Sequence, residues 1–230
     1  MNSGRRDFLT GLTEVAPVVV AYIPIGLLWG TLAAAKGISA LEAMLMSVIV
    51  FAGSAQFVAV DMWHDPVPVL LLIFTALIIN VRHVLMSASL SRHVEAIPRA
   101  LHPVVAYFLV DESWALAERR VLETPLTFAY YLGITVPLAM TWWITTGLGA
   151  MLGRALGDPS ALGLDFAFSA MFIAILMGFW KGPSTLGVLA ASGGVAAATH
   201  LAFDGPWYIV AGGLAGALYA YATWRPGEEA

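Results

Sequence analysis

The sequence contains no cysteine and little charge, and each shortage excludes a class of protein. Without cysteine there are no disulfides, no thiolate metal ligands and no cysteine nucleophile. Charged residues make up only 11% of the 230 residues, whereas soluble domains carry about 25%. Hydrophobic residues account for 60% of the chain. The composition therefore predicts an all-α, polytopic membrane protein that lies in the lipid bilayer.

Sequence motifs for energy supply or chemistry are also missing. No glycine-rich loop ends in Gly-Lys-Ser or Gly-Lys-Thr, so ATP is not the energy source within this chain. The five histidines are scattered and lack the spacing of a metal site. No paired motif of a membrane hydrolase is visible. We therefore expect no cofactor, no metal ion, no enzymatic activity and no nucleic-acid partner.

The hydrophobic residues are gathered in runs near the length of a spanning helix, which needs about 20 residues. We expect one membrane domain over residues 1–230, with seven spanning helices, or eight if residues 99–120 also cross. The seven runs cover residues 15–35, 41–60, 67–90, 126–153, 164–180, 185–202 and 206–224.

Residues 99–120 allow two interpretations. Their apolar part, residues 103–110, is short and ends at Asp111 and Glu112. As a spanning helix, the segment would place both acids near mid-membrane, as candidates for proton transfer or as partners for Arg82. As an amphipathic helix at the interface, it would leave both acids as solvated charges. The sequence does not separate these alternatives.

The two halves of the chain match each other. FAGSAQF at residues 51–57 shares five of its seven positions with FAFSAMF at residues 166–172, and Pro24 matches Pro137. Each unit would contain three spans, so the units would be inverted if the connector does not cross, a frequent plan for secondary transporters. The predicted organisation is repeat one at 15–90, a connector at 91–125, repeat two at 126–203 and a final helix at 204–224.

The run at residues 67–90 carries Asn80, Arg82 and His83 two thirds of the way along it. A charge at mid-membrane depth costs about 2.5–3.5 kcal/mol on insertion scales, so it usually faces a polar cavity or a partner. The alternative is that Arg82 lies near a helix end and reaches the headgroups. Because residues 84–90 continue the helical pattern beyond it, we favour the first interpretation.

Further candidates for contact with a solute lie in the other runs. Pro24 predicts a kink or break, and half-helix ends there would offer partial charges to a carboxylate or an ammonium group. Gly53 and Ser54 leave room for an aliphatic side chain, and Ser169 has the matching place in the second repeat. Gln56 either binds the solute or only bonds a neighbouring helix. Such a set is typical of a proton-coupled carrier for a small, partly polar solute.

Several motifs together resemble the AzlC family of branched-chain amino acid permeases, also called LIV-E exporters. They are FAGSAQF at residues 51–57, Asn80-Val81-Arg82-His83, and Asp111-Glu112 followed by Trp114. The resemblance covers nearly the whole chain. It implies export of valine, leucine, isoleucine or their analogues, coupled to the proton gradient. It also implies a multi-pass location in a bacterial inner membrane and a small hydrophobic partner subunit of the AzlD type.

Carried over onto this sequence, the family pattern points to a set of polar residues. We hypothesise that Gln56 and Asn80 bind the backbone groups of the solute and that Arg82 faces its carboxylate. A histidine titrates near neutrality, which suits proton coupling. The proton-coupling candidates are His83, Asp111 and Glu112. The full set is Ser54, Gln56, Asn80, Arg82, His83, Asp111 and Glu112.

Two other functions remain open. One is a structural subunit of a membrane complex that does not itself transport, and the other is a channel for another small solute. A scaffold has no reason to retain Arg82 at such a cost in free energy. Saturable, gradient-dependent flux separates a carrier from a channel.

Overall fold

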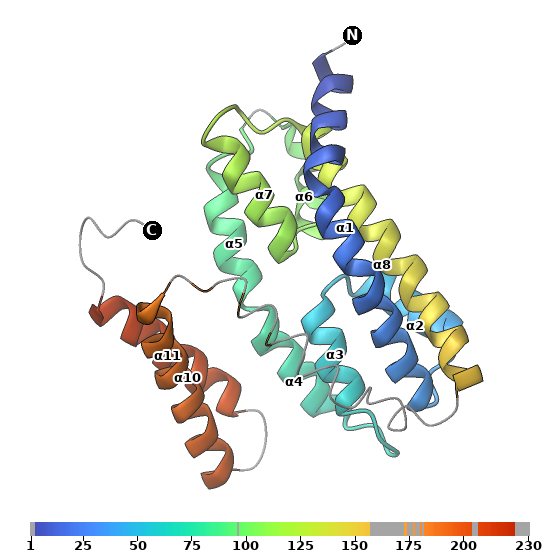
Figure 1. The fold of residues 1–230 in the computed structure, drawn as a ribbon, viewed down its shortest axis with the longest axis vertical. Helices are drawn as coiled ribbons and strands as arrows, with labels where there is room; N and C mark the ends of the chain where they lie inside the picture. Colours follow the sequence, from blue (N-terminus) through green and yellow to red (C-terminus); the bar gives the residue numbers. More distant parts are fainter. Residues whose placement is uncertain are drawn as a thin grey trace. The chain divides into compact units, whose positions relative to one another are not determined.

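The computed structural model of the chain describes residues 3–95, 97–156, 182–203 and 207–223, together with the single positions 173, 177 and 180. Over these residues the chain is helical and contains no strand, in agreement with the predicted fold class. The chain divides into two compact units (Figure 1). The first unit comprises Met1–Val67 with Asn80–Ala167, and the second comprises Pro68–Ile79 with Phe168–Ala230.

Two long helices, α1 (Ser3–Ala35) and α8 (Phe128–Leu156), form the frame of the first unit. Both contain proline, Pro17 and Pro24 in α1 and Pro137 in α8, and each helix continues through it. The break expected at Pro24 therefore does not occur, and no half-helix end lies there. Each proline removes one backbone donor, and α1 stays helical through both while it packs along α8.

The two frame helices run side by side in the same direction (Figure 1). Gly11 of α1 lies against Gly133 of α8, and further along the pair Gly30 lies against Thr146. A Cβ on Gly30 would lie 2.1 Å from the Thr146 carbonyl oxygen, so the two backbones approach too closely for any side chain there. Close contact through small residues is a common means of association between membrane helices.

The first hairpin consists of α2 (Ala40–Ile49) and α3 (Gly53–Asp61), with residues 50–52 as its tip. A capping box starts α2: the Ser39 hydroxyl accepts from the Glu42 N–H, and the Glu42 carboxylate accepts from the Ser39 N–H. These contacts satisfy two of the free backbone donors at the start of the helix.

The chain turns back at the tip of the first hairpin. Lys36, just beyond α1, donates from Nζ to the Asp61 carbonyl at the end of α3, at 3.2 Å. Since α2 begins only four residues after Lys36, both outer ends of the hairpin lie beside the C-terminal end of α1. The prediction of one spanning helix over residues 41–60 is therefore wrong. With 10 residues, α2 is about 15 Å long, half of the roughly 30 Å of hydrocarbon that a span must cross.

The third hydrophobic run forms α4 (Val69–Asn80) and α5 (Arg82–Ser91), which are separated at Val81. α5 belongs to the first unit, whereas α4 up to Ile79 belongs to the second. The helical stretch Val69–Ser91 as a whole is long and apolar enough to cross a membrane. Arg82 is thus the first residue of α5, at the junction of two helices.

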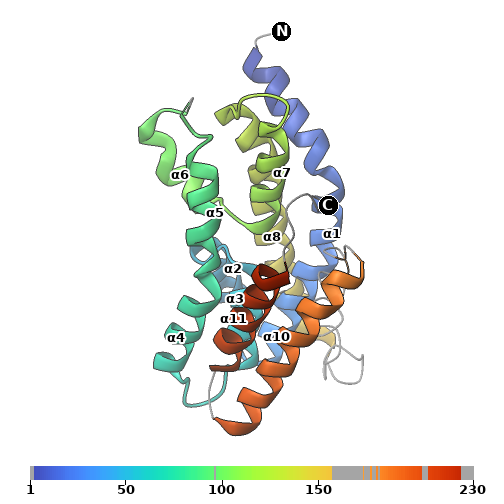
Figure 2. The same ribbon diagram turned by 90° about the vertical axis from the view of Figure 1, so that its left-hand side faces the viewer.

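The second hairpin consists of α6 (His102–Tyr107) and α7 (Asp111–Val121), with residues 108–110 as its tip. The short 3-10 helix η1 (Arg99–Leu101) precedes it, and α7 lies beside α5 (Figure 2). Both interpretations of residues 99–120 assumed a single helix, whereas the structure has two short ones. The chain is extended at the tip, where the Val110 N–H donates to the Ser113 hydroxyl at 2.9 Å.

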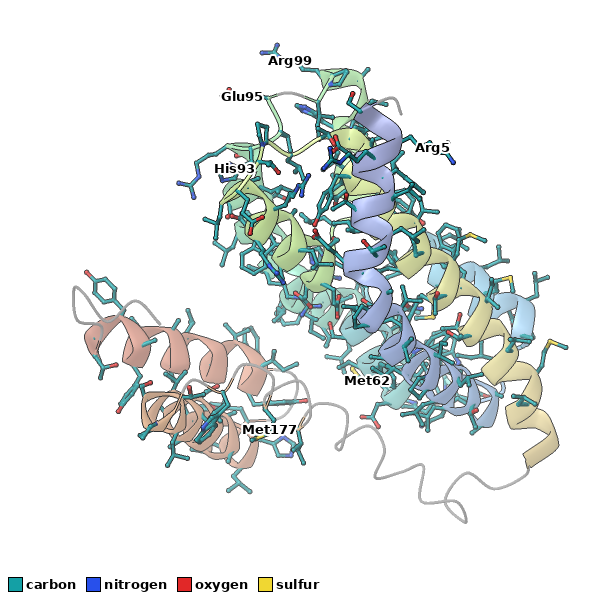
Figure 3. All side chains as sticks on the ribbon, turned by 45° about the horizontal axis from the view of Figure 1, so that its top comes forward. Arg5, Met62, His93, Glu95, Arg99 and Met177 are labelled. Carbon is teal, nitrogen blue, oxygen red and sulfur yellow. The ribbon has the colours of Figure 1, made fainter. Side chains whose placement is uncertain are left out.

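The two hairpins open at opposite ends of the first unit. The second hairpin ends beside the start of α1, where Arg120 Nη2 lies 3.7 Å from an oxygen of Asp7. The first hairpin opens beside the C-terminal end of α1. Figure 3 shows the same arrangement, with Arg5 and Arg99 at one end of the unit and Met62, which follows α3, at the other.

The tips of the two hairpins meet in the middle of the first unit. The Tyr107 hydroxyl, at the end of α6, donates to the Val48 carbonyl near the end of α2. The rings of Phe51 and Phe108, one from each tip, are in edge contact with centroids 6.2 Å apart. Each hairpin therefore reaches about halfway along the frame helices and stops against the other.

In the second unit, α10 (Pro183–Ala202) and α11 (Trp207–Thr223) pack against each other in opposite directions (Figure 2). Glycine again permits the contact, since a Cβ on Gly212 would lie 2.9 Å from the Ser192 carbonyl oxygen. Of the two, α10 is long and apolar enough to cross a membrane.

Three helical stretches in the described part of the chain are long and apolar enough to cross a membrane: Ser3–Ala35, Val69–Ser91 and Pro183–Ala202. The predicted seven or eight spans are not confirmed, since residues 41–60 form two short helices, and the predicted repeat boundaries stay predictions. The second copy of the repeated motif, at residues 166–172, lies outside the described residues. The matched helices α1 and α8 run in the same direction, whereas inversion places matched helices in opposite directions, so their arrangement gives no support to inversion.

Candidate functional site

Three helices begin where the hairpin tips meet, and their first residues contact one another. Arg82, at the start of α5, donates from Nη2 to the Ser54 hydroxyl at the start of α3, at 2.6 Å. Its Nη1 lies 2.6 Å from Oδ2 of Asp111, the first residue of α7. One guanidinium group therefore links α3, α5 and α7 at their N-terminal ends.

Helix N-termini carry partial positive charge and free N–H groups, which favour an anion. Ala52, which precedes α3, makes no side-chain capping bond to that helix. Asp111 is the acidic residue at the start of α7, beside the guanidinium of Arg82. The site thus combines a cation and two helix N-termini with one internal carboxylate, an arrangement suited to a carboxylate-bearing ligand.

The Arg82–Asp111 pair is accessible to a solute. The side chains of Arg82 and Asp111 retain 37% and 40% of their accessible surface. Within the described residues, the buried Nε of Arg82 and Oδ1 of Asn80 have no hydrogen-bond partner. Buried polar atoms are normally paired, so Nε of Arg82 and Oδ1 of Asn80 keep unused hydrogen-bonding capacity beside the ion pair. His83 is adjacent, with Nδ1 3.2 Å from the Asn80 carbonyl.

Glu112 follows Asp111 in the chain but has a different partner. The Tyr22 hydroxyl, on α1, donates to Oε2 of Glu112 at 2.6 Å. Glu112 is thus held by a neutral hydroxyl of α1, whereas its neighbour Asp111 is held by the guanidinium of Arg82. Tyr22 is held in turn by an edge contact with the Trp142 ring at 5.7 Å.

Gln56 is fully buried, and both ends of its amide are in use. Its Nε2 donates to the Ser47 hydroxyl of α2 at 3.0 Å, and its Oε1 accepts from Trp142 Nε1 of α8 at 2.8 Å. The amide therefore fastens the two arms of the first hairpin together and to the frame. This arrangement supports the interpretation in which Gln56 bonds neighbouring helices, because a solute reaches the amide only by displacing one of these partners.

We predict that Gln56→Ala lowers the stability of the folded protein and not its rate of transport. The substitution leaves the buried Trp142 N–H without its acceptor, which costs about 1–3 kcal/mol. Export per folded molecule should then stay within about threefold of the original rate, while the amount of folded protein falls. The measurement is transport normalised to the monodisperse peak in size-exclusion chromatography. A loss of transport at normal folded yield would show instead that Gln56 binds the solute.

The structure gathers most of the predicted site residues at this junction. Ser54, Arg82 and Asp111 contact one another directly. Asn80 and His83 flank Arg82 in the chain, and Glu112 follows Asp111. The remaining predicted residues are Gly53, beside Trp142 at the start of α3, Gln56 in the buried network, Pro24 inside α1 and Ser169, which lies outside the described residues.

Sequence reasoning missed Tyr22, Ser47 and Trp142. Each makes its contact with a residue far away in the sequence or on the other arm of a hairpin. A hydroxyl and an indole N–H in apolar runs need hydrogen-bond partners when buried, which is the signal that was available. In the described part of the chain, no group of three His, Asp or Glu side chains is arranged to hold a metal ion.

Comparison with known proteins places the chain in a family. A family model described as AzlC protein matches residues 17–156, which include α1 from residue 17, all of α8, both hairpins and the junction. The chain belongs to the AzlC family. The resemblance seen in the sequence motifs is thereby confirmed.

AzlC relatives match over most of the chain. The inner membrane protein YgaZ of Escherichia coli is 30% identical over 94% of this chain and 91% of its own length. A membrane protein of Archaeoglobus fulgidus is 31% identical over 92% of this chain and 93% of its own length. The branched-chain amino acid transport protein AzlC of Bacillus subtilis is 23% identical over 88% and 80%. No solved structure matches the chain.

Proposed function

We propose that this AzlC-family chain is the large subunit of a secondary-active exporter of branched-chain amino acids. One of its relatives is named as a branched-chain amino acid transport protein. The observation that carries the proposal is the position of Arg82, between Ser54 and Asp111, where three helices begin. Valine, leucine and isoleucine share a zwitterionic head and an apolar side chain, and the site offers a partner for each part.

Arg82 and Asp111 match the two charges of an amino acid. The α-carboxylate pairs with the Arg82 guanidinium and faces the N-terminus of α3, where Ser54 lies. The α-ammonium group pairs with the Asp111 carboxylate. A bound zwitterion thus separates Arg82 from Asp111 and gives each of them a new partner of opposite charge. Neither charge is then left unpaired. Asn80, whose Oδ1 has no hydrogen-bond partner among the described residues, is a further acceptor for the ammonium group.

The aliphatic side chain of the solute lies beside Gly53 in this proposal. A Cβ on Gly53 would lie 3.4 Å from the edge of the Trp142 ring, in ordinary contact, so the glycine lies against the indole, which forms an apolar wall. Phe57, one turn along α3, extends this wall, since its ring lies 6.4 Å from that of Trp142. Apolar walls with a few placed polar groups are the usual form of a small-molecule site.

The two hairpins provide the two sides of a carrier. In a bilayer, each would enter from one membrane face and return to the same face, with its tip at the midplane. Substrate sites at the midplane between half-length helices are typical of secondary transporters. We infer a multi-pass chain in a bacterial inner membrane, with a small hydrophobic partner of the AzlD type and the proton gradient as the energy source.

Efflux of valine from bacterial cells tests the proposal. Cells that lack their own branched-chain exporters are loaded with a valine-containing dipeptide and express the full chain alone or with its small partner. We expect faster, saturable export of valine that is lost when the proton gradient is dissipated. Export that rises linearly with internal valine would indicate a channel. Unchanged export of all three branched-chain amino acids would contradict the proposed substrate and leave a non-transporting subunit as the function.

A further inference from the structure

Glu112 stands beside the proposed ammonium site but is not part of the ion pair. Asp111 faces Arg82, whereas Glu112 faces α1 and accepts from the Tyr22 hydroxyl at 2.6 Å. In the part of the chain that the structure describes, no cationic nitrogen lies within 4.0 Å of Glu112. Two consecutive carboxyl groups thus have different environments, one with a cation and one with a neutral hydroxyl.

Asp111 and Glu112 differ in their nearest charges. Asp111 forms an ion pair with Arg82 at 2.6 Å. A second negative charge next to it, on a carboxyl removed from water, is unfavourable. The groups that act on Glu112 are Tyr22 from α1, Arg82 from α5 and Asp111 in α7 itself. The adjacent negative charge of Asp111 and the removal from water therefore favour the neutral form of Glu112 while the site is empty.

We propose that Glu112, hydrogen-bonded to Tyr22, is the proton-exchange group of the carrier: it holds a proton in the empty site and releases it when an amino acid binds. This inference rests on the proposed function, because the trigger is the ammonium group of the solute at Asp111. When Arg82 turns to the solute carboxylate, the ammonium group becomes the cation nearest to Glu112. The Glu112 O–H then ionises to a carboxylate and a proton leaves to water, while the Tyr22 hydrogen bond is kept.

This order of events makes the protein an antiporter. Solute and proton compete for the same site, since the site carries either a neutral Glu112 and no solute or an ionised Glu112 and an amino acid. Export of the solute therefore returns a single proton in the opposite direction. An inward proton gradient therefore drives the amino acid outward, which is the direction of export in the proposed function.

Tyr22 is a positioning residue in this scheme. Its ring is fixed by the edge contact with Trp142, and its hydroxyl stabilises the carboxylate of Glu112 when the proton has left. Tyr22→Phe should therefore shift the pH profile of transport to higher pH, because the ionised form of Glu112 loses a hydrogen bond. A merely structural role for Tyr22 would lower the rate equally at every pH.

The test compares two assays in proteoliposomes that contain the full chain, alone and with its small partner. Valine–valine exchange needs no net movement of protons, whereas valine accumulation into vesicles with an acidic lumen requires proton antiport. We expect Glu112→Gln to retain exchange within about tenfold and to lose accumulation, because the amide cannot release a proton. The matched control is Glu118→Gln on the same helix, where Glu118 accepts from Ser89 away from the junction. It should keep both activities.

Each outcome bears on one claim. Accumulation by Glu112→Gln at the original level would overturn the role of Glu112 and leave the proposed function intact. Loss of both activities in correctly folded Glu112→Gln would also overturn it, since Glu112 would then be needed for binding. Absence of valine exchange by the unaltered chain would instead contradict the proposed function. As a second readout, addition of valine to the unaltered protein in weak buffer at neutral pH should release a proton, and no release would refute antiport through Glu112.

Discussion

Replacing Arg82 with glutamine should abolish export of branched-chain amino acids. The guanidinium joins Ser54 and Asp111 and is the proposed partner of the solute carboxylate. Once an amino acid occupies the site and excludes water from these charges, removing one member of the set costs about 2–5 kcal/mol, so the rate of export should fall by about 30-fold or more. The measurement is the initial rate of valine efflux per folded molecule. Arg82→Lys should recover only part of the loss, since an ammonium group lacks the fork geometry of a guanidinium.

Arg92→Gln is the matched control, because Arg92 lies at the other end of α5 with an exposed side chain. It should export at the original rate. The double variant Arg82→Gln with Asp111→Asn removes both charges and so leaves no unpaired carboxylate. We expect it to fold as well as the unaltered chain and still not transport. Normal export by Arg82→Gln would show that the solute carboxylate binds elsewhere.

A valine at Gly149 should separate the two frame helices. A Cβ there would lie 2.2 Å from the Leu27 carbonyl oxygen and 2.8 Å from the Leu27 Cα, so the backbone of α1 has to move. Overpacking of this kind typically costs about 1–3 kcal/mol, and more against a rigid backbone. We expect a fall in the midpoint of thermal unfolding in detergent of roughly 5–10 °C, together with a much lower yield of folded protein.

Gly193→Val is the control for the seam between the frame helices. Gly193 is also a helical glycine, in α10, and a Cβ there meets no atom within 4 Å among the described residues. Both variants place a β-branched valine in a helix, at the same cost in helix propensity. The difference between their thermal midpoints therefore reports the packing at Gly149. Equal thermal midpoints for the two variants would contradict the close contact of α1 and α8.

The polar part of the site was predictable from sequence because charged residues are costly in a membrane and are therefore easily recognised in apolar runs. Arg82 and Asp111 occur in or beside apolar runs, and a charge there needs a partner. The structure supplies that partner in the 2.6 Å ion pair, which was one of the two interpretations of Asp111. The partner of Glu112 was not predictable in this way, because Tyr22 lies 90 positions away and carries no charge.

The hairpins were missed because hydropathy measures the length of a run and not its direction. Residues 41–60 are apolar throughout, and nothing in composition shows that the chain reverses at residues 50–52. The prolines were misleading for a related reason. Pro24 lies in a helix that packs along α8 and continues, whereas both tips form without proline. Tertiary contacts such as that between Tyr107 and the Val48 carbonyl satisfy the backbone at the tips, and a single run of sequence does not reveal them.

Competition by valine analogues in the exchange assay tests the central claim most directly. The claim is that Arg82 and Asp111 bind the two charges of an amino acid where the hairpins meet. N-acetylvaline lacks the ammonium group and valinamide lacks the carboxylate, while both keep the side chain. We predict that valine, leucine and isoleucine block the exchange of labelled valine and that each analogue blocks it at least about 30-fold less well, the cost of one unpaired charge. Equal competition by either analogue would show that the corresponding charge is not recognised, and would contradict the account.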